Sequence, residues 1–207
     1  MMDVIGLMGA HRTGKSTLHD VLTQDINNQY ANKFTSIPVS ISSWQREIAF
    51  NSSNQAYDWE TRKNIQGYLL SRFEQTLAQG VTMIHPAMVN HQLVNNIQIT
   101  ERTPLDLIGY LLLNTPENPT QEDLEWIDSY KAECIGLTNA FYEKVFLLQP
   151  GILYVECDTS AKEDSIDKLN AFYLHTLLDP RLIIDRHIID SNMTNLNDRV
   201  TEIITNL

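Results

Sequence analysis

A glycine-bounded segment near the N-terminus carries the residue types that bind phosphate. Residues 9–16 read Gly-Ala-His-Arg-Thr-Gly-Lys-Ser and match the pattern G-x-x-x-x-G-K-S/T. The glycines let the backbone bend so that successive N–H groups can point at one phosphate. Lys15 can then reach the β- and γ-phosphates of a nucleoside triphosphate, and the Ser16 hydroxyl can bind Mg²⁺. We expect the whole loop to contact the triphosphate, through Gly9, Ala10, His11, Arg12, Thr13, Gly14, Lys15, Ser16 and Thr17.

The residues on either side of this loop have the patterns that such a loop requires. Val4–Met8 is an apolar run typical of a buried parallel strand. After the loop, Leu18, Val21 and Leu22 recur at helical spacing. A helix that begins at the loop adds the positive end of its dipole to the phosphate site. Strand, loop and helix together predict a binding site for a nucleoside triphosphate.

A second pair of charged residues follows a short run of β-prone residues. Glu101 and Arg102 come directly after Ile97–Thr100, a strand that we expect to lie beside the first one. Phosphoryl transfer needs a group that holds Mg²⁺, a group that positions the acceptor, and cationic charge near the moving phosphoryl group. Glu101 could be a metal ligand or the base for an acceptor hydroxyl, and Arg102 could bind an anion through two hydrogen bonds. We therefore predict that Lys15, Glu101 and Arg102 are catalytic and that Ser16 and Glu101 bind the metal.

Apolar patterns along the rest of the chain predict strands that alternate with helices. Further strands are expected at 34–39, 144–148 and 186–190. Helices are expected at 44–50, 58–78, 121–142 and 195–207, with loops at 40–43 and a loop with a short helix at 80–96. Pro38 favours an edge position for the second strand, and Thr103 with Pro104 marks the start of a helix. This order predicts a three-layer α/β/α fold with a five-stranded parallel sheet.

Length and charge limit the classes of function. The chain has 207 residues, and we expect one domain over 1–207. It carries 15 Lys and Arg against 26 Asp and Glu, a formal net charge of −11. An acidic surface repels nucleic acid, because non-specific affinity depends on cationic contacts with phosphate. A helicase, a packaging motor or a DNA-directed ATPase is therefore disfavoured, whereas a small phosphorylated ligand needs few local cations.

Nothing in the sequence predicts export or a membrane partner. Met1, Met2 and Asp3 precede the first strand, so we expect no signal peptide, and no apolar run is long enough to span a bilayer. Cys134 and Cys157 match no metal-binding spacing, and we expect both to be reduced thiols. These features predict a cytoplasmic protein.

The loop at 9–16 and residues 101–106, Glu-Arg-Thr-Pro-Leu-Asp, resemble two motifs of the P-loop kinases of nucleosides and nucleotides. Thymidylate kinases carry Asp-Arg at the second place, and deoxynucleoside kinases carry Glu-Arg-Ser. The resemblance is closest to kinase-like proteins grouped with the nicotinamide riboside kinase domain, many of them phage-encoded, which show Asp-Arg-Thr-Pro-x-Asp. It implies a kinase that uses ATP and Mg²⁺ to phosphorylate a nucleoside or a (deoxy)nucleoside monophosphate, with Arg102 toward the acceptor.

The chain departs from these kinases in the lid, which we expect over residues 152–178, with its helix at 166–178. Such kinases place arginines in the lid to cover the transferring phosphate, whereas residues 158–169 offer Lys162 and Lys168 among acidic side chains. A lysine can supply a point charge but not a bidentate contact. We expect Lys162 to be catalytic and Lys168 to be a solvated charge. Two alternatives stay open: Arg12 supplies the cation, or catalysis is weak and the protein mainly binds nucleotide.

Further residues could touch the acceptor. Arg46 and Glu47 resemble the Arg-Glu pair that follows the second strand of these kinases, but the solvated face of a short helix is an equal interpretation. Four aromatic residues could stack on a base, although packing is the more common role of each: Trp44, Tyr57, Trp59 and Tyr68.

Two other functions stay open from the sequence. The first is a nucleotide-dependent ATPase or switch that acts on a protein partner, but the guanine-specificity pattern Asn-Lys-x-Asp is absent from the chain. The second is a kinase of a modified base in phage DNA, which the net charge disfavours. The expected partner is a small nucleoside or nucleotide, and the chain could also form a homodimer.

Overall fold

The computed structural model describes residues 4–23, 34–48, 57–83, 88–89, 92–93, 97–151 and 163–207. The helices are α1 (Lys15–Thr23), α2 (Ile41–Glu47), α3 (Trp59–Met83), α4 (Pro104–Leu113), α5 (Gln121–Phe141), α6 (Glu163–Leu177) and α7 (Leu196–Thr205). The strands are β1 (Val4–Met8), β2 (Phe34–Ser36), β3 (Met88–Val89), β4 (Gln92–Leu93), β5 (Ile97–Thr100), β6 (Lys144–Leu148) and β7 (Asp185–Ile189). Among the described residues, no helix combines the length and the hydropathy that a membrane span needs.

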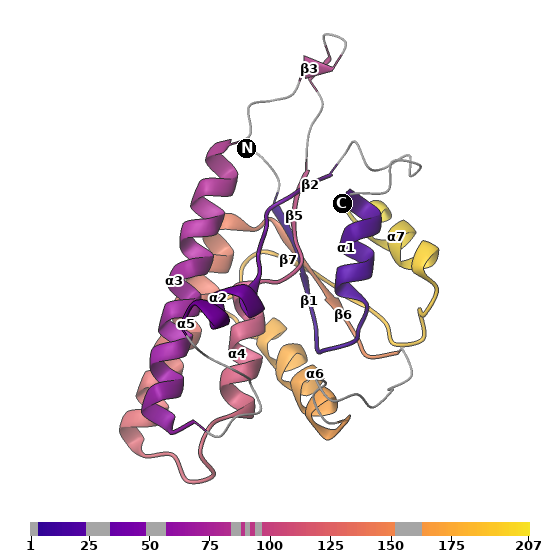
Figure 1. Cartoon of the computed structure of the whole chain (residues 1–207). Coiled ribbons are helices and arrows are strands. Elements are labelled where there is room, and N and C mark those ends of the chain that lie inside the picture. The colour runs from indigo at the N-terminus through magenta and orange to yellow at the C-terminus, as the bar shows by residue number, and fades with distance from the viewer. Residues whose placement is uncertain are drawn as a thin grey trace.

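A five-stranded parallel sheet forms the centre of the molecule, with the strand order β2-β5-β1-β6-β7 (Figure 1). This order confirms the predicted sheet, the edge position of β2 and the place of β5 beside β1. In the register of that pair, Gly6 lies opposite Thr100. Parallel strands end at the same edge of a sheet, which is where ligands bind in such folds. The phosphate loop after β1 and Glu101 after β5 therefore meet at one edge.

Helices cover both faces of the sheet, as the predicted three-layer fold requires. The pair α1 and α7 lies on one face, and α3, α4, α5 and α6 lie on the other (Figure 1). Ile5 and Leu7 of β1 belong to the core under α1 and α7, whereas Val4 and Met8 belong to the core on the opposite face. All four are at most 2% exposed. Burial of each such side chain stabilises the fold by about 1.5–3 kcal/mol, so β1 is anchored from both sides.

The start of α4 is capped in the way that the sequence predicts. The Asp106 carboxylate accepts hydrogen bonds from the backbone N–H of Thr103 at 2.8 Å and from its hydroxyl at 3.0 Å. Pro104 occupies the first turn, where a missing N–H costs nothing. This capping box determines the direction of the chain directly after Glu101 and Arg102.

Two local predictions are wrong. Helix α2 begins at Ile41, inside the segment expected to be a loop, because Ile41 packs against the core. Helix α3 runs through Gly80 to Met83, and β3 and β4 pair antiparallel in a region where a short helix was expected. Gly80 does not end the helix; a Cβ there would lie 3.0 Å from the Ile37 side chain, so glycine permits close packing instead.

The expected lid lies partly outside the described residues. Segment 152–162, which contains the predicted catalytic Lys162, is outside them. Helix α6 packs on α4, with Leu169 and Tyr173 fully buried between them. The Tyr173 ring occupies the space beside Gly109, where a Cβ would lie 2.2 Å from it. One side of α6, the described part of the expected lid, therefore belongs to the core. Lys168 lies on the other side of this helix and is exposed.

Candidate active site

The phosphate loop turns sharply between β1 and α1. Gly9 has a φ of 148°, Arg12 of 61° and Gly14 of 85°. A Cβ at Gly9 would also lie 2.6 Å from the carbonyl oxygen of Leu148, which excludes any side chain there. The backbone thus requires both glycines, as the motif predicts. Arg12 adopts a left-handed conformation that costs a residue other than glycine about 1–3 kcal/mol.

The Lys15 ammonium lies inside this loop. Its Nζ donates hydrogen bonds to the carbonyl oxygens of Gly9 at 2.7 Å and Ala10 at 2.5 Å, and to the Thr13 hydroxyl at 3.2 Å. The residue is 4% exposed. Burial and then a neighbouring arginine lower the pKa of Lys15 well below its ordinary value, while two nearby carboxylates oppose that shift. A phosphate beside the loop would favour the charged form of this side chain.

The two residues predicted to bind a metal are in direct contact. The Ser16 hydroxyl donates to Glu101 Oε1 at 2.5 Å. Among the described residues, no group of three or more His, Cys, Asp or Glu side chains could hold a metal. Mg²⁺ needs no such group, because it commonly takes one or two protein oxygens, at about 2.0–2.1 Å, and completes its shell with water and substrate phosphates. Ser16 and Glu101 fit that donor set.

Asp106 joins the loop to the second motif. Its fully buried carboxylate accepts hydrogen bonds through Oδ1 from the backbone N–H of Gly9 at 3.3 Å and from the Arg102 guanidinium at 3.2 Å. The same guanidinium nitrogen donates to the Gly9 carbonyl at 3.3 Å. Sequence reasoning predicted no role for Asp106. Its position three residues after Thr103 indicates a helix cap, but its contact with a loop almost a hundred residues away leaves no mark in the sequence.

Arg102 keeps its positive charge at the junction of the loop and the neighbouring pocket. Its side chain is 17% exposed. Burial opposes the charge, but the surrounding acidic groups, Tyr110 and Asp106 foremost, raise the pKa of Arg102 above its ordinary value. The residue also lines the pocket, so one guanidinium touches the loop and faces the space beside it.

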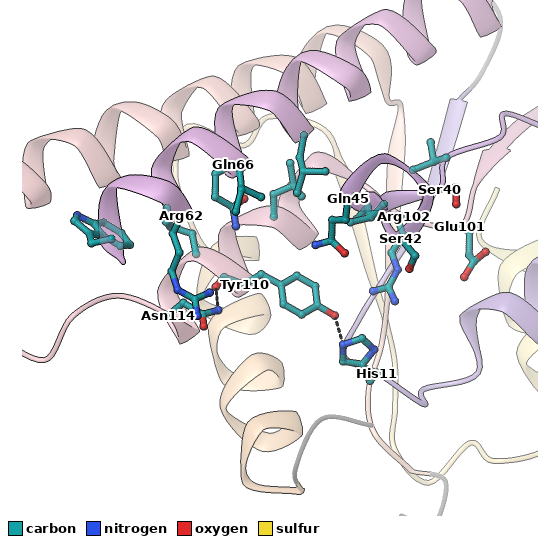
Figure 2. A pocket seen from close by; sticks show the side chains of 17 residues that line it. His11, Ser40, Ser42, Gln45, Arg62, Gln66, Glu101, Arg102, Tyr110 and Asn114 are labelled. Carbon is teal, nitrogen blue, oxygen red and sulfur yellow. Dashed lines mark hydrogen bonds between the residues drawn. The ribbon is translucent and has the colours of Figure 1, made fainter. Parts of the chain in front are cut away.

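A pocket of about 200 Å³ lies next to the phosphate loop, between α3, α4 and the segment that leads into α2 (Figure 2). We call its two ends the loop end, lined by His11, Glu101 and Arg102, and the distal end, lined by Arg62, Gln66 and Asn114. Apolar side chains of α3 and α4, such as Leu69 and Leu107, line the wall between them. The pocket thus runs from the phosphate loop to polar groups on two helices.

The His11 side chain belongs to this pocket as well as to the loop. Its Nε2 lies 2.8 Å from the Tyr110 hydroxyl, and the two rings make an edge contact with centroids 5.5 Å apart. Burial, followed by the charges of Arg102, Lys15 and Arg12, lowers the pKa of His11 to about 4. The imidazole is therefore neutral at neutral pH. The sequence predicted His11 as a phosphate contact, and the structure adds its place in the pocket wall.

Helix α2 contributes other residues to the pocket than the pair that the sequence singled out. Arg46 and Glu47 are both exposed, and Glu47 accepts hydrogen bonds from the Tyr68 hydroxyl at 2.6 Å and from Arg72 at 3.3 Å. The residues of α2 that line the pocket are Ile41, Ser42 and Gln45, and neither Arg46 nor Glu47 is among them. The solvated-face interpretation of the pair is therefore the better one.

Of the four aromatic residues that could stack on a base, one lines the pocket and three do not. Trp59 lines the pocket, and its indole N–H donates to Asp123 at 2.6 Å. Trp44 is buried against Phe73, with ring centroids 5.2 Å apart. Tyr57 packs at the edge of the core, and Tyr68 bonds to a surface carboxylate.

Arg199 of α7 is a buried arginine that supports the loop from the far side, and sequence reasoning missed it. It is 2% exposed, and it donates to the carbonyl of Thr13 through a terminal nitrogen and to that of Met193 through Nε, both at 2.5 Å. Burial lowers the pKa of Arg199. No motif marks it, because an arginine on an amphipathic helix is expected to face water.

The sequence matches no family model and no curated protein, whereas the fold matches solved structures. The deoxyadenosine kinase from M. mycoides with products dCMP and a flexible dCDP bound has a TM-score of 0.60 and 16% identity, over 98% of this chain and 97% of that one. The thymidylate kinase from Ehrlichia chaffeensis has a TM-score of 0.60 and 14% identity, over 99% and 97%. NadR in complex with NR has a TM-score of 0.63 and 14% identity, over 99% of this chain and 50% of NadR.

The chain has the fold of the P-loop kinases. The predicted resemblance to nucleoside and nucleotide kinases is thus confirmed in the fold, over nearly the whole chain. At 14–16% identity the likeness is one of fold, and the chemistry depends on the side chains that this chain places on it. On this kinase fold, the pocket opens beside the loop at the edge where β1 and β5 end.

Proposed function

We propose that this protein is a Mg²⁺-dependent kinase that transfers the γ-phosphoryl group of ATP to a nucleoside or a nucleoside monophosphate. The observation that carries the proposal is the continuity of loop and pocket: His11, Glu101 and Arg102 adjoin the phosphate loop and line the pocket at once. An acceptor in the pocket would present its reactive oxygen directly to a triphosphate on the loop. Such positioning supplies much of the rate enhancement in phosphoryl transfer.

On the donor side, the backbone N–H groups of the loop would bind the phosphates. The Lys15 ammonium would exchange its bonds with the carbonyls of Gly9 and Ala10 for bonds with phosphate oxygens. Ser16 and Glu101 would hold Mg²⁺, which when bound neutralises charge on the phosphates. Asp106 would keep Arg102 in place through their ion pair.

On the acceptor side, a bond forms between the acceptor oxygen and the γ-phosphorus while the bond to the β–γ bridging oxygen breaks, and ADP leaves. A hydroxyl acceptor also releases a proton. Among the described residues that line the pocket, Glu101 is the sole carboxylate. Its Oε1 accepts from Ser16, so Oε2 is the oxygen that could take the proton. A monophosphate oxygen is already ionised near neutral pH and needs no base.

A small acceptor fits this arrangement better than the two alternatives. The pocket lies between helices and is lined by side chains of α3 and α4, as a small-molecule site is. A strand of DNA would meet a chain with a net charge of −11. An ATPase that drives a protein partner has no need of a pocket that continues the phosphate loop.

A screen of phosphoryl transfer tests the proposal. ATP would be supplied with Mg²⁺ and with each common nucleoside and 5′-monophosphate, and both ADP and phosphorylated acceptor would be measured. We expect transfer to a subset of the panel. Glu101→Gln should stop transfer to a nucleoside hydroxyl, whereas with a monophosphate it should mainly raise the Mg²⁺ concentration that is required. ADP production without any phosphorylated acceptor would contradict the kinase and support the ATPase.

A further inference from the structure

The distal end of the pocket holds polar groups whose hydrogen-bonding roles are set by their neighbours. Arg62 and Gln66 lie one turn apart on α3, and Asn114 lies at the C-terminus of α4 (Figure 2). All three are partly buried. They lie away from Glu101 and the phosphate loop, in the place that the base of a bound nucleoside would reach. Any role of this end in recognising a base rests on the proposed function.

Asn114 offers an acceptor to the pocket. Its Nδ2 donates a hydrogen bond to the backbone carbonyl of Tyr110 at 2.7 Å. A carbonyl oxygen can only accept, so this bond determines which end of the amide is nitrogen. The Oδ1 of Asn114 is therefore the atom left to accept a hydrogen bond from a ligand.

Gln66 and Arg62 offer donors. The Tyr130 hydroxyl, on a residue that is 3% exposed, donates toward Gln66 Oε1 at 3.0 Å and toward the Gln66 backbone carbonyl at 3.1 Å. With Oε1 held by this hydroxyl, Nε2 is the end of the Gln66 amide that can serve the pocket. A guanidinium has five N–H groups and no acceptor, so Arg62 can only donate. The distal end thus presents two donor groups and one acceptor.

We propose that the distal end is a base subsite selective for uracil and thymine. The pairing edge of these bases carries two carbonyl acceptors and one ring N–H donor, which matches two protein donors and one acceptor. Cytosine and adenine replace a carbonyl by an amino group and the N–H by a bare ring nitrogen. Each would set donor against donor at Gln66 or Arg62 and acceptor against acceptor at Asn114. Guanine also has one carbonyl and a ring N–H on this edge. Its amino group, however, takes the place of the second carbonyl and would face one of the two protein donors.

The charge around the subsite points to the same bases. Exocyclic amino groups are commonly bound by carboxylates, and Glu101, the sole carboxylate among the described lining residues, lies at the opposite end of the pocket on Ser16. A base with the wrong pattern would leave polar groups of the subsite, and its own polar groups, without hydrogen-bond partners. That loss would give the subsite its selectivity.

Binding and turnover, measured separately, test this subsite. Thymidine, deoxyuridine, deoxycytidine, deoxyadenosine and deoxyguanosine, and their 5′-monophosphates, would be titrated by calorimetry without ATP and then assayed with it. We expect thymidine or deoxyuridine compounds to bind about 100-fold more tightly than the deoxycytidine ones. Tighter binding of deoxycytidine or deoxyadenosine compounds, or binding of no member of the panel, would overturn the subsite.

Variants of Gln66 sharpen the result. Gln66→Glu replaces the donor nitrogen by an acceptor, and it should weaken binding of thymidine by about tenfold or more and strengthen binding of deoxycytidine. Gln75→Glu, which makes the same change of charge at an exposed position of α3 that does not line the pocket, should leave the ranking of bases unaltered. If Gln66→Glu fails to fold, Gln66→Met removes the donor at similar volume and should weaken thymidine binding alone. An unaltered base ranking in the folded Gln66 variants would overturn the assignment of Gln66.

The two proposals fail in different ways. Selective binding of thymidine compounds without phosphorylated product would uphold the subsite and contradict the kinase. Transfer to deoxycytidine or deoxyadenosine acceptors in preference to thymidine would uphold the kinase and contradict the subsite.

Discussion

The loop end and the distal end of the pocket are built in opposite ways. At the loop end, the functional groups come from two short runs of sequence, residues 9–16 and 101–106, and backbone atoms of the loop accept or donate several of the hydrogen bonds. Lys15 is bonded to three groups of its own loop, and Arg102 is bonded to Asp106 and to Gly9. At the distal end, three side chains from two separate helices supply the polar groups. The groups proposed for phosphoryl transfer thus lie on two local motifs, whereas the groups proposed to select the acceptor are brought together by helix packing.

The two ends also differ in how tightly they are constrained. At the loop end, Gly9 is confined by its close approach to the Leu148 carbonyl, and Asp106 is fully buried. Gln66 and Asn114 of the distal end are partly buried, with one or two bonds each to the protein. Substitutions at the loop end should therefore lower the rate with every acceptor, whereas those at the distal end should reorder the acceptors.

The largest expected effect belongs to Lys15→Ala. Removing the ammonium should lower kcat by about a thousandfold or more with every acceptor, because Lys15 is the cation that the loop encloses beside the expected phosphate site. Turnover and circular dichroism would be measured together, with Lys168→Ala, an exposed lysine of α6, as the matched control. Near-normal turnover of a folded Lys15→Ala variant would contradict the catalytic role of the loop.

Arg102 and Arg62, which line the two ends of the pocket, provide the sharpest test of whether these ends have different roles. Arg102→Ala should cost about 2–5 kcal/mol in acceptor kcat/KM, because it removes a buried charged contact, and should affect ATP binding far less. Arg62→Ala should instead change the preference among bases and affect the rate with the best acceptor less. Steady-state kinetics with both substrates varied would separate the outcomes. Equal weakening of ATP and acceptor by Arg102→Ala would move that arginine to the donor side.

A smaller effect is expected from the pH dependence of stability. The pKa of His11 is about 4 in the fold, against an ordinary value of 6.5, so the unfolded chain binds more protons between these values. The free energy of unfolding should therefore fall as the pH falls from 6.5 toward 4, by up to about 3 kcal/mol from this group. His11→Asn should flatten that dependence, whereas His175→Asn, at an exposed site on α6, should not. Urea unfolding at several pH values would measure both.

The smallest expected effect concerns Lys162, which lies outside the described residues. If it closes over the transferring phosphate, Lys162→Ala should lower transfer about tenfold and raise the share of ATP lost to hydrolysis. Lys168→Ala should resemble the parent, because that side chain is exposed. Transfer and hydrolysis would be measured side by side. If both variants match the parent, Arg12 is the next cation to replace.

Much of the fold could be predicted from the sequence because its signals are local. The five strands were placed by apolar runs, and the start of α4 by the capping residues Thr103 and Pro104. The signals failed where packing outweighed composition. Gly80 looked like a break but sits inside α3 against Ile37, and Ile41 looked like part of a loop but begins α2.

The sequence by itself determined the phosphate loop and the acid–base pair after β5, because each depends on neighbours within a few residues. Tertiary structure alone decided that Asp106 joins that pair to Gly9, that Arg199 supports Thr13, and that Gln66 and Asn114 line one pocket. Such contacts join helices and strands that are far apart in the chain. They depend on how the helices pack on the sheet, and no short stretch of sequence records that.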